Sequence, residues 1–159
     1  DSWDATLGLR GGAQRYDESI EVLDVNRFLY SLGVTRRFAS RAQLSAQVLG
    51  GNDSEQFDGS PYGNSKIGGR LGLSMPVGTS AWLLASLGSL TSDYDSLFFG
   101  TTREDTQLFT MLQLEFRDVL TNGFAIIPRV RYVNNDSDVE LYSYDRTELG
   151  IAFRWTPQP

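Results

Sequence analysis

The stretch 146–155, "RTELGIAFRW", shows the pattern that decides the fold. In an extended strand successive side chains point to opposite faces, so every second residue shares a face. One face of this stretch then carries Thr147, Leu149, Ile151, Phe153 and Trp155. The other carries Arg146, Glu148, Gly150, Ala152 and Arg154. Such a strand needs two environments, so its charges face either bulk water or the inside of a closed sheet.

Similar alternation recurs along the chain, whereas helical periodicity is nearly absent. We expect about eight strands, near residues 3–15, 24–38, 41–51, 66–77, 80–92, 104–117, 123–134 and 143–156. The register of the fifth strand is ambiguous, because Trp82 and Leu84 compete with Leu83 and Leu87 for the same face. No run approaches the ~20 apolar residues that a transmembrane helix requires.

The composition excludes several classes of protein. A chain of 159 residues makes one domain, and a net charge of −6 argues against a nucleic-acid-binding protein. The chain has no cysteine and no histidine, the commonest metal ligand and general base, and we predict no enzyme activity, no metal site and no cofactor. Lys66 is the only lysine beside thirteen arginines, a bias that suits planar, paired contacts inside a structure.

The connections between the expected strands alternate in length. Residues 37–41, 76–80 and 117–123 form short turns, whereas 16–24, 51–65, 92–104 and 134–143 form long, acidic loops. In an up-and-down sheet all short turns then lie at one end, which is the asymmetry of outer-membrane barrels. Trp3, Trp82 and Trp155 fall at the short-turn end, and Tyr16, Tyr94, Tyr132, Tyr142 and Tyr144 fall toward the loop end. Two such aromatic belts are typical of the two membrane interfaces.

A soluble sandwich or a lipocalin-like cup also alternates, so alternation alone does not decide between these folds. Strand length does, since sandwich strands average about 5–6 residues and a tilted transmembrane strand needs about 9–11. We therefore predict an all-β chain over residues 1–159. Its fold is an antiparallel up-and-down transmembrane β-barrel with about eight strands, either a complete small barrel or the C-terminal half of a larger one.

The alternation assigns residues to two faces of this barrel. The polar ladder expected to face the lumen comprises Arg10, Arg27, Arg41, Arg70, Glu115, Arg117, Arg129, Arg131, Arg146, Glu148 and Arg154, with Glu148 between Arg146 and Arg154. The lipid-facing or interfacial residues are Trp3, Leu71, Leu73, Leu112, Leu114, Phe116, Tyr132, Ile151, Phe153 and Trp155. A cationic lumen could pass or hold an anionic ligand. Alternatively, an arginine–carboxylate network fills the narrow interior of an eight-stranded barrel.

Three segments together resemble a known family: 59–77 ("GSPYGNSKIGGRLGLSMPV"), 90–108 ("LTSDYDSLFFGTTREDTQL") and 127–155 ("IPRVRYVNNDSDVELYSYDRTELGIAFRW"). They are similar to the C-terminal barrel of the surface lipoprotein assembly modifiers (the Slam family) and related outer-membrane proteins. The matching elements include Tyr94-Asp95, Arg103 with Asp105, and Pro128-Arg129. The chain departs from the family pattern in having Ser137-Asp138 where the family tends to carry Ser-Asn.

The resemblance implies an integral protein of the outer membrane of a Gram-negative bacterium, which helps to translocate polypeptides such as surface lipoproteins. The implied partners are outer-membrane lipid and lipopolysaccharide, the barrel-assembly machinery, a periplasmic repeat domain and an exported polypeptide. The alternative is a stand-alone eight-stranded barrel with a plugged, arginine-rich lumen and acidic external loops, in a structural or surface-binding role.

Overall fold

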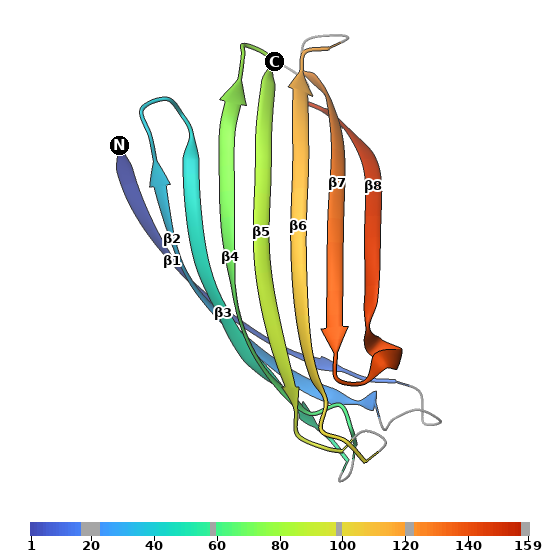
Figure 1. The fold of residues 1–159 in the computed structure, drawn as a ribbon. Coiled ribbons are helices and arrows are strands. Elements are labelled where there is room, and N and C mark those ends of the chain that lie inside the picture. The colour runs from blue at the N-terminus through green and yellow to red at the C-terminus, as the bar shows by residue number, and fades with distance from the viewer. Residues whose placement is uncertain (17–22, 58–59, 98–99, 120–122, 157–159) are drawn as a thin grey trace.

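The computed structural model describes residues 1–16, 23–57, 60–97, 100–119 and 123–156. They form one sheet of eight antiparallel strands in chain order (Figure 1). The strands are β1 (Ser2–Gln14), β2 (Val25–Arg37), β3 (Gln43–Glu55), β4 (Asn64–Val77), β5 (Ala81–Tyr94), β6 (Glu104–Arg117), β7 (Phe124–Ser137) and β8 (Tyr144–Trp155). The 3-10 turn η2 (Glu140–Tyr142) lies between β7 and β8. The predicted all-β, up-and-down arrangement of eight strands is confirmed.

Two strands continue further than the sequence predicts, into segments expected to be loops. β3 runs on to Glu55, and Asp53 pairs with Arg27 of β2. β7 runs on to Ser137, which pairs with Asp105 of β6. The backbone ladder extends through these polar residues because a neighbouring strand satisfies their N–H and C=O groups.

The predicted start of the third strand at residue 41 is wrong. Arg41 lies in the tight turn between β2 and β3 and has a left-handed backbone, with φ of 68°. The turn is closed by hydrogen bonds from Phe38 N–H to Ala42 O and from Arg41 N–H to Phe38 O, both at 2.9 Å. Arg41 therefore does not belong to the alternating ladder that was predicted to include it.

The sheet is open in the described part of the chain. β1 pairs with β2 and β8 pairs with β7, but β1 and β8 do not pair with each other. Figure 1 shows the sheet strongly curved, with β1 and β2 passing behind the later strands. The curvature gives the sheet a concave and a convex face.

No second layer covers this sheet within the described residues, so the apolar core is very small. The buried hydrophobic residues are Val25, Ala125 and Val133. Large apolar side chains such as Leu71, at 57% exposure, and Phe153, at 67%, lie open instead. Among the described residues no helix is long and apolar enough to cross a membrane. Exposed apolar surfaces of this size are uncommon on soluble monomeric proteins.

Candidate functional site: a polar trough on the concave face

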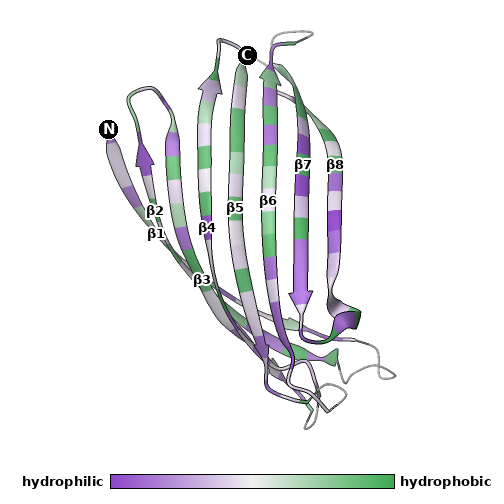
Figure 2. Ribbon diagram, viewed as in Figure 1, coloured by the Kyte–Doolittle hydropathy of each residue, from purple (hydrophilic) through white to green (hydrophobic). Residues whose placement is uncertain are grey.

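The strand register settles which residues share a face. Residues that pair directly across an antiparallel ladder point the same way. One row runs Ala5, Val34, Ala46, Leu71, Leu87, Thr110, Tyr132 and Thr147. The neighbouring row runs Asp4, Thr35, Ser45, Gly72, Ser86, Met111, Arg131 and Glu148. The first row belongs to an apolar face and the second to a polar one, as Figure 2 shows by the alternating colours along the strands.

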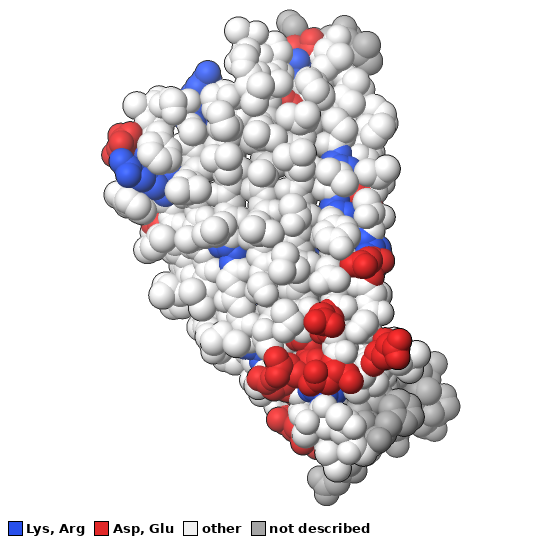
Figure 3. Space-filling model, in the orientation of Figure 1, with Lys and Arg blue, Asp and Glu red and all other residues white. Residues whose placement is uncertain are grey.

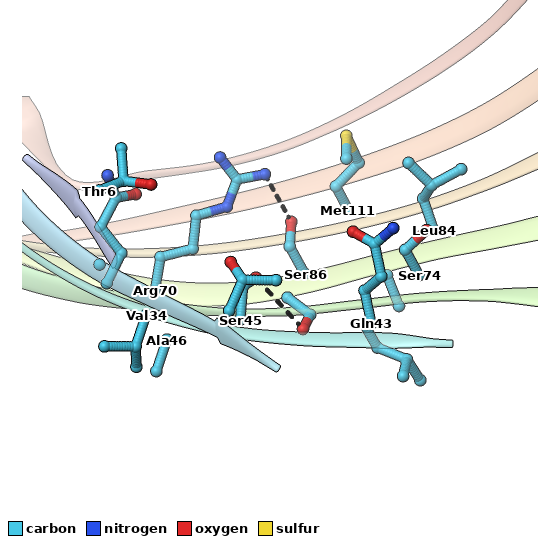
Figure 4. Close-up of a pocket in the computed structure, with 16 residues that line it drawn as sticks. Thr6, Val34, Gln43, Ser45, Ala46, Arg70, Ser74, Leu84, Ser86 and Met111 are labelled. Carbon is cyan, nitrogen blue, oxygen red and sulfur yellow. Dashed lines mark hydrogen bonds between the residues drawn. The ribbon is translucent and has the colours of Figure 1, made fainter. Parts of the chain in front are cut away.

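The close-up in Figure 4 identifies the polar face as the concave one. Arg70, Ser86 and Gln43 point into the space enclosed by the curved sheet. Val34 and Ala46 point away from it. All the residues predicted to be lipid-facing fall on the convex face by register: Trp3, Leu71, Leu73, Leu112, Leu114, Phe116, Tyr132, Ile151, Phe153 and Trp155.

The convex face carries charge only near the strand ends. Its ionisable acids and bases within the strands are Arg36, Asp93, Glu104, Asp136 and Asp145. Figure 3, drawn from this side, shows a mostly uncharged surface with some basic groups visible toward one edge, and carboxylates gathered mainly toward the loop end. The middle of the convex face is thus an apolar band with charged borders.

The register of β5 places Trp82 on the concave face, contrary to its predicted membership of an interfacial belt. Trp82 pairs with Glu115, and its Nε1–H donates to Ser74 Oγ at 2.6 Å. Leu84 shares the concave face with Trp82, whereas Leu83 and Leu87 lie on the convex one.

The belt of tyrosines expected at the loop end is also only partly present. Tyr94 pairs with Asn64, and Tyr144 pairs with Asn135, so both lie on the concave face. Tyr132 is on the convex face, where its hydroxyl donates to Asp145 Oδ1 at 2.7 Å. Trp3 and Trp155 do lie on the convex face at the short-turn end, and the rings of Phe124 and Phe153 stack there at 6.1 Å.

Apart from Arg41, the residues of the predicted polar ladder lie on the concave face. Cations outnumber carboxylates there, although the whole chain is acidic. The strand cations on this face are Arg10, Arg27, Arg37, Lys66, Arg70, Arg117, Arg129, Arg131, Arg146 and Arg154. The strand carboxylates are Asp4, Asp53, Glu55, Asp105, Glu115 and Glu148. The acidic surplus of the sequence therefore lies in the loops and at the strand ends.

Many of these charges form clusters in which one carboxylate binds two cations. Asp53 accepts from Arg27 at 2.8 Å and from Lys66 at 2.7 Å. Glu115 accepts from Arg117 at 2.6 Å and also from Arg154. Such pairing stabilises these charged side chains, which would otherwise lie on the concave face without partners.

Glu148 forms the third cluster, with Arg146 at 2.9 Å and Arg131 at 3.7 Å. Glu148 keeps its predicted place between Arg146 and Arg154 on the polar face of β8, but it pairs with only one of these two arginines. Arg154 reaches Glu115 instead, because the register of β6, β7 and β8 brings those side chains together.

A fourth cluster, at the loop end, was not identified as a site from residue patterns. Arg103 is 7% exposed, donates from Nε to Asp105 Oδ1 at 2.9 Å and makes a second hydrogen bond to Oδ2. Its guanidinium carbon lies 4.2 Å from the ring centre of Tyr94 and 3.4 Å from that of Tyr142. Burial acts to lower the pKa of Arg103, but the hydrogen bonds to Asp105 and the nearby tyrosines raise it further, so the net pKa lies above its ordinary value. The only indication of this cluster in the sequence is that Arg103 and Asp105 are among the residues that carry the family resemblance.

The middle of the concave face holds a hollow of about 340 Å³, which we call the central hollow. Its lining includes Gln43, Ser45, Gln47, Arg70, Ser86 and Met111 (Figure 4). Arg70 Nη2–H donates to Ser86 Oγ at 3.0 Å, and Ser45 Oγ–H donates to Gly72 O at 3.3 Å. Hydroxyls, amides and one guanidinium are groups that hold or pass a polar solute.

The chain matches no family model, and no similar curated protein or solved structure is found.

Proposed function

We propose that the eight strands form the lipid-spanning part of an outer-membrane β-barrel in a Gram-negative bacterium. Its convex face contacts lipid and its concave face lines the lumen. The observation that carries the proposal is a single-layer sheet whose convex face is apolar and uncharged over the middle of its strands and whose concave face is polar and cationic. A sandwich covers its apolar face with a second sheet, and a lipocalin-like cup turns apolar residues inward. Here the apolar residues face outward, as in a membrane barrel.

The strand lengths fit a bilayer. The strands have 12 to 14 residues. At about 3.3 Å per residue, a strand of this length extends over about 40 Å. Tilted by about 45°, it rises about 30 Å, which is the thickness of the hydrocarbon core. The charged residues of the convex face lie near the ends of this span, where headgroups and water accommodate them.

We further propose that the sheet is one part of a wider barrel, whose remaining strands pair with β1 and β8. The open edges support this, because unpaired backbone groups at a sheet edge are unfavourable in lipid. A wider barrel has room for a water-filled lumen. Translocation of a polypeptide, together with a periplasmic repeat domain, is the activity that the resemblance to the Slam family implies.

A closed eight-stranded barrel with a filled interior is the second candidate. The clusters around Asp53, Glu115 and Glu148 favour it, since paired charges of this kind would fill a narrow lumen. In that case β1 and β8 pair with each other and the barrel has a structural or surface-binding role.

The first experiment tests the two faces with adjacent residues of β3. These 159 residues contain no cysteine, so an introduced thiol is distinctive. In the full-length protein in native outer membranes, we expect Gln47→Cys to react with a water-soluble maleimide and Val48→Cys to resist it. Val48→Cys should react with a lipid-soluble maleimide. Equal labelling of both thiols by the water-soluble reagent would contradict the membrane assignment.

The second experiment distinguishes the two barrels. Leu149→Cys in β8 is combined in turn with Leu9→Cys, Gly11→Cys and Ala13→Cys in β1, all on the convex face, because the register stagger of a closed barrel brings the loop half of β1 beside Leu149. In the wider barrel none of the pairs forms a disulfide within one chain under mild oxidation. A disulfide in one of the pairs would show that β1 and β8 are neighbours and would support the closed eight-stranded barrel.

A further inference from the structure

The central hollow contains a cation without a carboxylate partner among the described residues. Arg10, Arg70 and Arg129 are the concave strand arginines for which the described residues provide no carboxylate within 4.0 Å. Of these three, Arg70 lines the hollow. Its guanidinium donates to the hydroxyl of Ser86, which leaves further N–H groups of its planar fork available.

The surroundings of Arg70 are polar but neutral. Gln47 lies directly opposite it in β3, and Gly88 lies directly opposite it in β5. Ser45 and Ser86 add hydroxyl groups at the wall of the hollow, and Figure 4 shows both close to Arg70. Gly88 itself has no side chain, and the ring of Phe109 from β6 lies over it, so no charged group enters from that side.

A guanidinium in such a place favours an anion. Its charge is not neutralised locally, and its fork matches the two oxygens of a carboxylate. Neighbouring serine hydroxyls and glutamine amides can donate further hydrogen bonds to the same group. The ion-paired arginines of the concave face differ, because Asp53, Glu115 and Glu148 already bind them.

We infer that the central hollow is a carboxylate-binding site, with Arg70 as its anchoring cation, for solutes or polypeptide segments that enter the lumen. The inference rests on the proposed function, since it requires the concave face to be wet. It adds the chemical class of the ligand and the residue that recognises it.

The experiment uses the reactivity of one introduced thiol to measure both the local electrostatic potential and the binding of a carboxylate ligand. Ser45→Cys is introduced into the full-length protein in native outer membranes, and its rates with an anionic and a cationic methanethiosulfonate are each divided by the rate with free cysteine. Ser45 is a diagonal neighbour of Arg70, at about 7 Å. A unit charge at that distance in water changes each rate by about threefold at low salt, so Arg70→Gln should lower the anion-to-cation ratio by about sevenfold.

Matched variants and probes separate a binding site from a general field. Arg70→Lys should keep most of the ratio, and so should Arg36→Gln, which removes one positive charge from the convex face. Free glutamate or an oligoglutamate peptide should slow the anionic reagent when Arg70 is present, and glutamine should not. Protection by free glutamate identifies a small-molecule site, whereas protection by oligoglutamate alone identifies a polypeptide site.

Two results would overturn the inference while the proposed function stands: a reactive thiol whose ratio is unchanged in Arg70→Gln, or a reactive thiol that neither carboxylate probe protects. A thiol that reacts with neither reagent would mean that the trough is dry. That result would overturn the water-filled lumen of the proposed function as well.

Discussion

Arg154 of β8 hydrogen-bonds to Glu115 of β6 across the intervening strand β7. Ala125 of β7 lies beneath this contact, since it pairs with Arg117 on one side and with Arg154 on the other. Ala125 is 3% exposed. A small side chain on the middle strand thus lets the two outer strands share one carboxylate.

Replacing Glu115 by Gln should destabilise the sheet by about 1 kcal/mol. The carboxylate is buried, but Arg117 and Arg154 are about half exposed, so water can solvate them once the carboxylate is lost. Urea unfolding of the protein in detergent or lipid measures the change. Glu148→Gln is the matched control and should cost less, because Glu148 is 41% exposed. Equal effects would show that burial of Glu115 has no energetic consequence.

Replacing Ala125 by Leu should lower the free energy of unfolding by about 1–3 kcal/mol, because the added atoms displace Arg154 from Glu115 and overpack the site. Ala46→Leu adds the same atoms on the convex face, where the side chain is exposed and none of the described segments covers it, and should be nearly neutral. Both free energies come from the same unfolding experiment. If Ala125→Leu also proved neutral, the contact across β7 would not constrain the sheet.

Arg103→Ala should have the largest effect of the charge variants. It leaves Asp105 buried without its bidentate partner, which costs about 3–5 kcal/mol when a buried pair is broken. Adding Asp105→Ala should restore part of that loss, because the unpaired carboxylate is removed as well. Arg103→Lys should rescue poorly, since the contacts with Tyr94 and Tyr142 use the flat face of a guanidinium. A double variant no more stable than Arg103→Ala would contradict this account of the cluster.

The sequence predicts the strands well where apolar residues alternate, because the period of two is directly visible in them. The ends of β3 and β7 were missed, since their pairing continues through polar residues that carry no apolar signal. The register of β5 was ambiguous because "AWLLASL" is apolar on both faces, and only pairing with β4 and β6 decides it.

Cross-strand partners were harder to predict than faces. Arg70 and Arg154 were assigned correctly to the polar face from alternation alone. The partner of Arg154 depends on the register of two further strands. That register cannot be deduced from the spacing of residues along one strand. Arg41 was misplaced because nothing in "RFASR" marks the left-handed residue of the turn.

Phe153→Arg tests the depth of the convex face. Phe153 pairs with Ile126 close to the short-turn end. Arginine at this position should therefore lower the free energy of unfolding by less than arginine at a convex position in the middle of the span. The change in unfolding free energy is the measurement. A cost at Phe153 larger than that at the middle of the convex face would reverse the proposed depth order.

The central claim, that the convex face meets lipid and the concave face meets water, is tested most directly by two adjacent residues of β3. Val48 lies on the convex face and Leu49 on the concave face, both at the middle of the strand, and the two side chains are similar in size. The measurement is the unfolding free energy in lipid bilayers of Val48→Arg and Leu49→Arg. We predict a cost of about 2–4 kcal/mol for Val48→Arg and a much smaller one for Leu49→Arg. Equal costs, or a larger cost for Leu49→Arg, would contradict the assignment of the two faces.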